Sequence, residues 1–267
     1  MSLLGTTKLL LRRFRIFPKR RLGQNFIVEP SIFERMANYA SLDQNDVVLD
    51  VGAGFGFLTR FLATRCATVL AVETDSVLVG VLREQLASVS NVRVIEGNVL
   101  KVHVPRFDKV VAIPPYQISS RFLAWLLHRN FDLAVLVFQK EFADRLVASV
   151  GSSDYGWLTV ATYYYAEVEL LDDMPKAMFY PQPKVDSVIV RLEPKKPSPF
   201  RLANRAFFER VVQSLFTQRN RKVRNAIQPF LHSANLAVSV DAVPFHDRRV
   251  RELAPEDFGV LANAIAE

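Results

Sequence analysis

The chain has 267 residues, of which 50% are hydrophobic and 23% are charged, enough for one α/β core and a smaller second unit. Its single cysteine, Cys66, excludes an intramolecular disulfide framework, and its scattered histidines provide no zinc-ligand pattern. No run of about 18 uncharged apolar residues occurs, and Arg12 and Arg13 interrupt the apolar run near the N-terminus before it could form a signal peptide. We therefore expect a globular cytoplasmic protein that holds no metal and contacts no membrane.

The net charge is +7, which suits a polyanionic partner. Most of the excess lies in two clusters that flank a nearly neutral centre. The first cluster comprises Lys8, Arg12, Arg13, Arg15, Lys19, Arg20 and Arg21, with no Asp or Glu before residue 29, and the second comprises Arg219, Arg221, Lys222 and Arg224. This distribution favours a nucleic acid bound at the edges of a site. The alternative is that the basic residues form a solvated face or a targeting tail.

Short runs rich in β-branched residues recur along the first half of the chain. The predicted strands are residues 47–51, 68–73, 92–96, 109–113 and 133–138, and segments with helical periodicity at 58–63 and 77–86 lie between the earlier ones. Strands that alternate with helices predict a parallel, doubly wound sheet.

Two later runs, 162–171 and 187–192, are separated by a turn-rich stretch instead of a helix, and therefore predict an antiparallel pair at a sheet edge. Residues 193–199 contain three prolines and two lysines and predict a linker. From residue 202 the periodicity is helical. We therefore expect a first domain over residues 1–194 and a small all-helical domain over 195–267. The apolar stripe that starts the second domain is Phe207, Phe208, Val211, Val212, Leu215 and Phe216.

A glycine-rich turn, VLDVGAGFGFLT, places Gly52, Gly54 and Gly56 after a strand and before a helix. Glycine permits a tight turn and the close approach of a ligand to the backbone. The G-x-G-x-G spacing differs from the pyrophosphate-binding G-x-G-x-x-G pattern, and no P-loop motif occurs. The pattern favours a nucleoside cofactor without phosphates, and a tight turn without any ligand is the alternative.

Polar residues end the next two strands. Glu73 follows Gly52 by 21 residues, where a carboxylate can accept hydrogen bonds from both hydroxyls of a ribose. Asn98 follows the third strand and could accept from the amine of an adenine, although an ordinary turn residue is an equal interpretation.

The segment Ile113-Pro114-Pro115-Tyr116 follows the fourth strand. Two prolines fix a rigid loop, and an aromatic ring after them offers a surface on which a planar base can stack. An amine nucleophile needs acceptors for its hydrogens and an in-line approach, so positioning supplies most of the catalysis. The loop suits an extruded adenine, and a simple strand terminator is the alternative.

Taken in their order along the chain, the glycine turn, Glu73, Asn98 and the loop 113–116 resemble the corresponding segments of the ribosomal RNA adenine dimethyltransferases. This is the KsgA/Dim1 family, which also includes relatives that confer macrolide resistance. The match runs from about Lys19 to the C-terminus, and the QKE, DYG and PKVDS segments favour the small-subunit enzymes. The matching segments are KRRLGQNFIVEPSI, VLDVGAGFGFLT, AVETD, VIEGNVLKV, IPPYQISS, FQKEFADRLVA with DYGWLTV, FYPQPKVDSVIVRL and LFTQRNRKVRNAI.

The resemblance implies a Rossmann-like class I methyltransferase sheet that binds S-adenosyl-L-methionine. It implies that Gln24, Asn25, Ile27 and Gly52 line the methionine end of the cofactor, that Glu73 holds the ribose, and that Asn98 faces the adenine. Gly54, Gly56 and Ile113 complete the implied cofactor site, and Ile113, Pro114, Pro115 and Tyr116 form the implied catalytic loop.

The chain departs from the family pattern at two of these positions. Asn98 stands where the family has Asp; it keeps a carbonyl acceptor but not the charge, so cofactor binding would weaken without being lost. Ile113 stands where the family has Asn, whose side-chain oxygen receives a hydrogen of the target amine. Backbone carbonyls at Ile113 or Pro114 could still accept, but the loss of one positioned acceptor can cost about a hundredfold in rate.

Three hypotheses follow. The first is methylation of two neighbouring adenosines near the 3′ end of small-subunit ribosomal RNA, by a monomer that binds the RNA or a pre-30S-type particle. Here Lys19, Arg20 and Arg21 and the residues Arg219, Arg221, Lys222 and Arg224 contact phosphates. The second is an assembly factor that binds the same RNA without chemistry, which Ile113 favours and the intact glycines and Glu73 disfavour. The third is methylation of a different amine or nucleic acid.

Overall fold

The structure, a computed structural model, describes residues 1–19 and 22–266 and divides into two compact units. The first comprises Met1–Ala143 and Glu169–Pro194, and the second comprises Asp144–Val168 and Lys195–Glu267. The sequence predicts a single boundary after residue 194, so the division differs at Asp144–Val168. This segment joins the second unit because Tyr155, Val160 and Tyr164 are buried in the helical core there.

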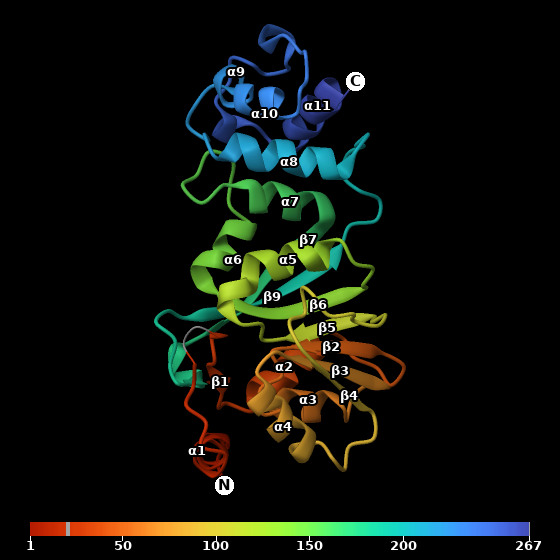
Figure 1. Cartoon of the computed structure of the whole chain (residues 1–267), viewed down its shortest axis with the longest axis vertical. Helices are drawn as coiled ribbons and strands as arrows, with labels where there is room; N and C mark the ends of the chain where they lie inside the picture. Colours follow the sequence, from red (N-terminus) through yellow and green to blue (C-terminus); the bar gives the residue numbers. More distant parts are fainter. Residues whose placement is uncertain (20–21, 267) are drawn as a thin grey trace. The chain divides into compact units, whose positions relative to one another are not determined.

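The first unit is built on a seven-stranded sheet in the order β4-β3-β2-β5-β6-β9-β7, which Figure 1 shows strand by strand. Neighbouring strands from β4 to β6 are parallel. The strands are β2 (Val47–Val51), β3 (Thr68–Glu73), β4 (Val92–Glu96), β5 (Lys109–Ala112), β6 (Leu133–Gln139), β7 (Ala166–Met174) and β9 (Ser187–Pro194). Chain order reverses between β2 and β5, and ligands bind at such a switch point in open α/β sheets.

The predicted parallel core of the sheet is confirmed. The first three predicted strands have the bounds of β2, β3 and β4, while β5 stops one residue earlier and β6 continues to Gln139. The two predicted helices correspond to α3 (Phe57–Leu62) and α4 (Ser76–Gln85), each of which begins and ends one residue earlier than predicted. The bounds of the central strands follow from local pattern, because strands buried in a parallel sheet are nearly continuous apolar runs.

Helices cover the sheet and a short second sheet lies beside it. Residues of α2 (Ser31–Tyr39) and α3 form one apolar cluster with Val48, Val69 and Val135 of the sheet. The remaining helices of this unit are α1 (Leu3–Arg13), α5 (Ser119–Leu127) and α6 (Lys140–Leu146), the last of which continues into the second unit. Strands β1 (Phe26–Ile27) and β8 (Phe179–Tyr180) pair antiparallel.

The antiparallel edge of the main sheet is confirmed, but one of its predicted strands is partly wrong. β9 runs antiparallel to β6, and β7 lies beside β9 at the edge. Residues 162–165 belong to α7 (Trp157–Tyr165), although they include three consecutive tyrosines that favour a strand. The helix persists there because Val160 and Tyr164 are buried one turn apart in the helical core, and tertiary packing overrides local propensity.

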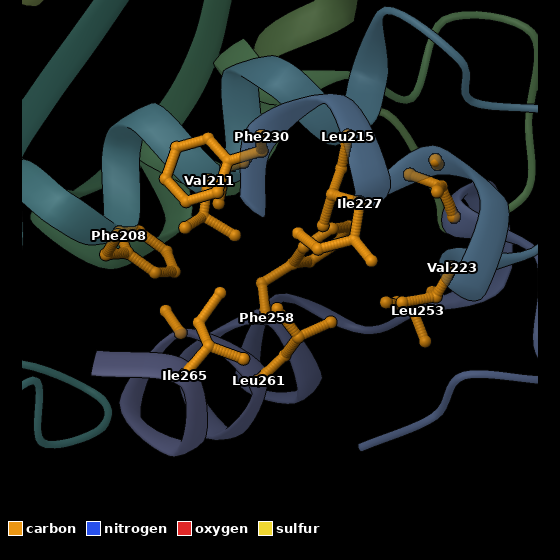
Figure 2. Packing of buried hydrophobic residues seen from close by; sticks show 14 of the residues in the cluster. Phe208, Val211, Leu215, Val223, Ile227, Phe230, Leu253, Phe258, Leu261 and Ile265 are labelled. Atoms are coloured by element: carbon orange, nitrogen blue, oxygen red, sulfur yellow. The ribbon is translucent and has the colours of Figure 1, made fainter. Parts of the chain in front are cut away.

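The second unit is mostly helical. Its helices are α7, α8 (Arg205–Phe216), α9 (Val223–Ala226), α10 (Gln228–Ser233) and α11 (Pro255–Ala266). Figure 2 shows Phe208, Val211 and Leu215 of α8 directed toward the apolar side chains of α10 and α11. The predicted stripe is therefore the buried face of α8. The predicted linker begins late, because β9 includes Glu193 and Pro194.

No helix in the described ranges is long and apolar enough to cross a membrane.

Candidate active site

Three cavities lie at the edge of the sheet where the parallel strands end, all within the first unit. The first lies between the ends of β2, β3 and β4, the second between the glycine turn and β1, and the third between the loop after β5 and the segment after β8. Gly52 lines the first and second cavities, and Asn25 lines the second and third. The cavities are therefore neighbours around the switch point of the sheet.

The first cavity gathers three of the predicted cofactor residues, Gly52, Glu73 and Asn98, together with Pro115 of the loop after β5. These residues come from four different strand ends, which only the parallel sheet brings together. The sequence did not single out Leu22, Val51, Val72, Thr74, Gly97, Val99, Gln117 and Ile118, which also line this cavity. Most of them are sequence neighbours of a predicted site residue, and this adjacency could have indicated them.

The glycine turn lies against the loop after β5. Gly52 has a φ of +80°, and a Cβ atom there would lie 3.0 Å from Cδ of Pro115 and 3.2 Å from the carbonyl oxygen of Ile113. The Gly52 N–H donates to the carbonyl of Val72 at 2.9 Å. Glycine is therefore required at residue 52 both for its left-handed conformation and for the close approach of two loops.

Gly56 packs against a helix, unlike the other two glycines of the turn. It does not line any of the three cavities. A Cβ atom at this position would lie 2.6 Å from Cδ1 of Leu82 in α4, so the absence of a side chain serves helix packing. Gly54, in contrast, lines the second cavity and lies under the ring of Phe26.

The carboxylate of Glu73 is buried and held by backbone N–H groups. One oxygen accepts from Thr74 at 2.8 Å and from Asp75 at 2.9 Å, and the other accepts from Gly54 at 2.9 Å. Burial raises the pKa of Glu73, while these hydrogen bonds oppose the increase. The carboxylate is thus fixed in one orientation at the wall of the first cavity.

Asn98 lies in a turn at the wall of the first cavity. It lines the first cavity, and its side-chain oxygen accepts from the N–H of Leu100 at 3.0 Å. That hydrogen bond closes a turn, as Asn commonly does after a strand.

The second cavity contains three of the four residues assigned to the methionine end, Asn25, Ile27 and Gly52, together with Gly54 and Ile113. The fourth, Gln24, lines the third cavity. Ile113 is half-buried, and its side chain packs with the apolar cluster under α2 and α3. It presents only alkyl groups.

Asp50 also lines this cavity, and it is not among the residues predicted from the sequence. Its side chain is buried and accepts from the hydroxyl of Thr59 at 2.6 Å. Burial raises the pKa of Asp50 from 3.8 to about 7, partly offset by the Thr59 hydrogen bond. The available signal was its position two residues before Gly52 in an otherwise apolar strand.

The third cavity is lined by Tyr116, by Gln24 and Asn25, and by the segment after β8. The Tyr116 hydroxyl is 2.7 Å from Oγ of Ser187, which is fully buried. Burial raises the pKa of Tyr116 to about 12, so the phenol is neutral at physiological pH. Pro114 is buried and lines none of the three cavities. The additional lining residues are Pro18, Gly23, Gln117, Gln139, Pro181, Gln182, Pro183 and Lys184.

Lys19, predicted to bind phosphate, is engaged within the protein. Its ammonium lies 2.7 Å from a carboxylate oxygen of Asp75, and Gln24 donates to the same oxygen at 2.8 Å. Burial alone would raise the pKa of Asp75, but these hydrogen bonds lower it. The network secures the segment before β1 to the N-terminus of α4. Arg20 and Arg21 lie outside the described residues.

The second basic cluster is wider in space than in sequence. Residues 219–224 pair with residues 246–251 through backbone hydrogen bonds, including Val250 N–H to Arg221 and Val223 N–H to Arg248. Asp247 contacts Lys222 and Arg224, and the Lys222 hydrogen bond lowers the pKa of Asp247. Arg219 donates to the carbonyls of Ser152 and Ser153. The pairing adds Arg248, Arg249 and Arg251, which were not predicted although the segment HDRRVR was the signal.

Comparison with known proteins agrees with this geometry. The sequence profile described as ribosomal RNA adenine dimethylase matches residues 17–267. A protein of Methanosarcina acetivorans named probable ribosomal RNA small subunit methyltransferase A is 41% identical, covering 91% of each chain. A protein of the same name from Methanothermobacter thermautotrophicus is 38% identical, covering 98% of this chain and 96% of the relative.

Solved structures show the same fold. A dimethyladenosine transferase of Plasmodium falciparum has a TM-score of 0.75 at 26% identity, covering 87% of this chain and 94% of the other. The 23S rRNA methyltransferase ErmE has a TM-score of 0.66 at 28% identity, covering 91% and 100%. The Rossmann-like class I methyltransferase fold and the resemblance stated from the motifs are both confirmed. The chain belongs to the ribosomal RNA adenine dimethylase family.

Proposed function

We propose that the protein transfers methyl groups from S-adenosyl-L-methionine to the N6 amines of two adjacent adenosines near the 3′ end of small-subunit ribosomal RNA. The observation that carries the proposal is the set of three neighbouring cavities at the switch point of the sheet. Gly52 lines two of them, Glu73 lines the first, and Tyr116 lines the third. Membership of the family and relatives named for the small ribosomal subunit support the choice of substrate.

The residues of the first two cavities fit S-adenosyl-L-methionine. Glu73 offers a fixed carboxylate to ribose hydroxyls, and Asn98 lies in the same cavity for the adenine. Asp50 and Asn25 offer polar groups to the amino acid end in the second cavity. A cationic ammonium there would favour the ionised form of Asp50. When bound, the cofactor supplies an electrophilic methyl group on a sulfonium.

The third cavity fits the target base. Tyr116 has its ring fixed by the hydrogen bond to Ser187, so it can stack on an adenine without losing freedom on binding. The carbonyl of Ile113, which lies against Gly52, would be the backbone acceptor for a hydrogen of the amine. Pro115 is engaged differently, because its carbonyl accepts from the N–H of Ile118 at 3.0 Å.

The basic clusters would contact the RNA backbone. In the second unit, Arg221 is exposed, and the paired segments 219–224 and 246–251 concentrate positive charge around it. Lys19 would act indirectly, because it holds the segment before β1 through Asp75. We propose that the protein acts as a cytoplasmic monomer on a small-subunit particle during ribosome assembly.

A second candidate function is that of an assembly factor that binds the same RNA and lacks chemistry. The observation that favours it is Ile113, which lines the second cavity with an alkyl side chain. Intact cofactor cavities disfavour it, because a pure binder has little use for them.

The two candidates are distinguished by methyl transfer. We would incubate small-subunit particles that lack the modification with radiolabelled S-adenosyl-L-methionine and the natural protein, Ile113→Asn or Ile113→Val. The Val variant is the matched control because it changes the side chain without adding a polar atom. Label in dimethyladenosine with the natural protein supports the enzyme. Label only with Ile113→Asn supports the assembly factor, and no label with either, although both bind the particle, contradicts the proposed reaction.

A further inference from the structure

The N-terminal helix α1 carries positive charge and is attached firmly to the first unit. Leu10, Leu11 and the following Ile16 are buried in one apolar cluster with residues of β1, the glycine turn and α4. Ser2 caps the helix by accepting from the N–H of Gly5 at 3.2 Å. The other members of the cluster are Phe26, Phe55, Leu78 and Val81. α1 is therefore a docked element, and it lies outside the range that the family profile matches.

The opposite face of α1 is exposed and basic. Lys8, Arg12 and Arg13 of α1 are exposed, and so is Arg15 in the turn that follows the helix. Arg13 pairs with Glu84 at 2.6 Å. Among the described residues, the structure gives no carboxylate partner to the other three. Charges of one sign that no internal carboxylate neutralises create a surface that attracts a polyanion.

This face begins beside the cavity that contains Tyr116. The ammonium of Lys8 lies 5.3 Å from the centre of the Tyr180 ring, and Tyr180 is followed directly by Pro181, Gln182, Pro183 and Lys184, which line the cavity. At the other end of the segment, Phe17 is 82% exposed and immediately precedes Pro18, which also lines the cavity. Figure 1 shows α1 next to β1, whose partner strand β8 contains Tyr180.

We propose that the exposed face of α1, with Phe17, is a binding surface for the single-stranded RNA that flanks the target nucleotide. Lys8, Arg12 and Arg15 would contact successive phosphates, and the Phe17 ring would stack on a base next to the one in the cavity. The inference rests on the proposed function for the identity of the RNA as substrate. A membrane surface fits less well, because the apolar face of α1 is already buried against the first unit.

The test compares two triple variants of the full chain. The first is Lys8→Gln, Arg12→Gln, Arg15→Gln, and the second is Arg93→Gln, Lys101→Gln, Arg106→Gln, which removes the same charge from exposed positions elsewhere in the same unit. Binding to a fluorescein-labelled 20-nucleotide RNA hairpin with an adenosine-containing loop is measured by anisotropy at several KCl concentrations. Circular dichroism checks that both variants unfold at the temperature of the natural protein.

We expect the α1 variant to bind the RNA about 10- to 100-fold more weakly, and the slope of log affinity against log salt to become shallower by about 2. Phe17→Ala should weaken binding about tenfold with no change of slope, and the second triple variant should weaken binding much less than the first. Equal effects of the two triple variants would overturn the proposal. It would also be overturned if the α1 variant kept its RNA affinity and lost binding to phosphatidylserine-containing vesicles.

Binding is measured without the methyl donor, so the outcome is separate from that of the proposed reaction. RNA binding that depends on α1, with no methyl transfer, contradicts only the reaction. Methyl transfer with RNA affinity unchanged in the α1 variant contradicts only the role of α1.

Discussion

Replacement of Gly52 by alanine tests the central geometric feature of the site. An L-residue at a φ of +80° costs about 1–2 kcal/mol, and the new Cβ would lie 3.0 Å from Pro115 and 3.2 Å from the Ile113 carbonyl, which adds roughly 1–3 kcal/mol of overpacking. Lower entropy of the unfolded chain offsets about 0.4–1 kcal/mol. We expect a net loss of roughly 2 kcal/mol in the free energy of unfolding, because both neighbours belong to rigid backbone or a proline ring.

Gly80→Ala provides the control. Gly80 lies in α4, and a Cβ atom there would meet no heavy atom within 4 Å apart from the backbone of its own helix, so alanine should stabilise the protein by about 1 kcal/mol. Urea unfolding gives the stabilities, and calorimetric titration gives the affinity for S-adenosyl-L-methionine. Gly52→Ala should bind at least about tenfold more weakly, since relief of the contacts moves the turn or the loop. Unchanged stability and affinity in Gly52→Ala would refute the reasoning.

Three further changes test individual residues. Asp50→Asn should remove a pH dependence of stability. Because the pKa of the buried Asp50 carboxyl is raised to about 7, the free energy of unfolding of the natural protein should fall by up to about 4 kcal/mol as the pH rises from 4 to 8, and that of the variant should not. Urea-unfolding stabilities that change with pH in parallel for the two proteins would contradict this. Glu73→Gln replaces an oxygen that accepts backbone N–H groups by a donor, and should cost about 1–3 kcal/mol of stability and at least tenfold in cofactor affinity by calorimetry; unchanged values would contradict the role of the carboxylate. Tyr116→Phe removes the hydrogen bond to Ser187 and should lower the methyl-transfer rate about tenfold at unchanged cofactor affinity; an unchanged rate would show that the hydroxyl does not position the ring.

The sheet and its glycine turn could be predicted because their signals are local. Residues 47–51 form a strand that is apolar except for Asp50 and is followed directly by the glycines, and Glu73 ends the next strand with the same bounds as predicted. Parallel strands place these ends on one edge, so the first cavity follows from the order of the elements alone.

The errors arise where distant residues decide the structure. Residues 162–165 favour a strand by composition, but burial of Tyr164 among the helices of the second unit keeps them helical. The pairing of Lys19 with Asp75 was not predicted either, because 56 residues separate the two in the sequence; the phosphate contact of Lys19 stays a prediction. Arg248 and Arg249 were missed because they lie beside the basic residues of 219–224 only through the pairing of that segment with residues 246–251.

The departure at Ile113 is confined to one step of the proposed reaction. Gly52 lies close to the backbone carbonyl of Ile113, and a carbonyl is present at this position whatever the side chain. Tyr116 is held by Ser187, and Glu73 is held by the N–H groups of its own turn and of Gly54. None of these supports passes through the Ile113 side chain. Ile113→Asn therefore adds an acceptor near the target amine while leaving the other parts in place, and its rate relative to Ile113→Val, at equal cofactor affinity, measures the contribution of that acceptor to catalysis.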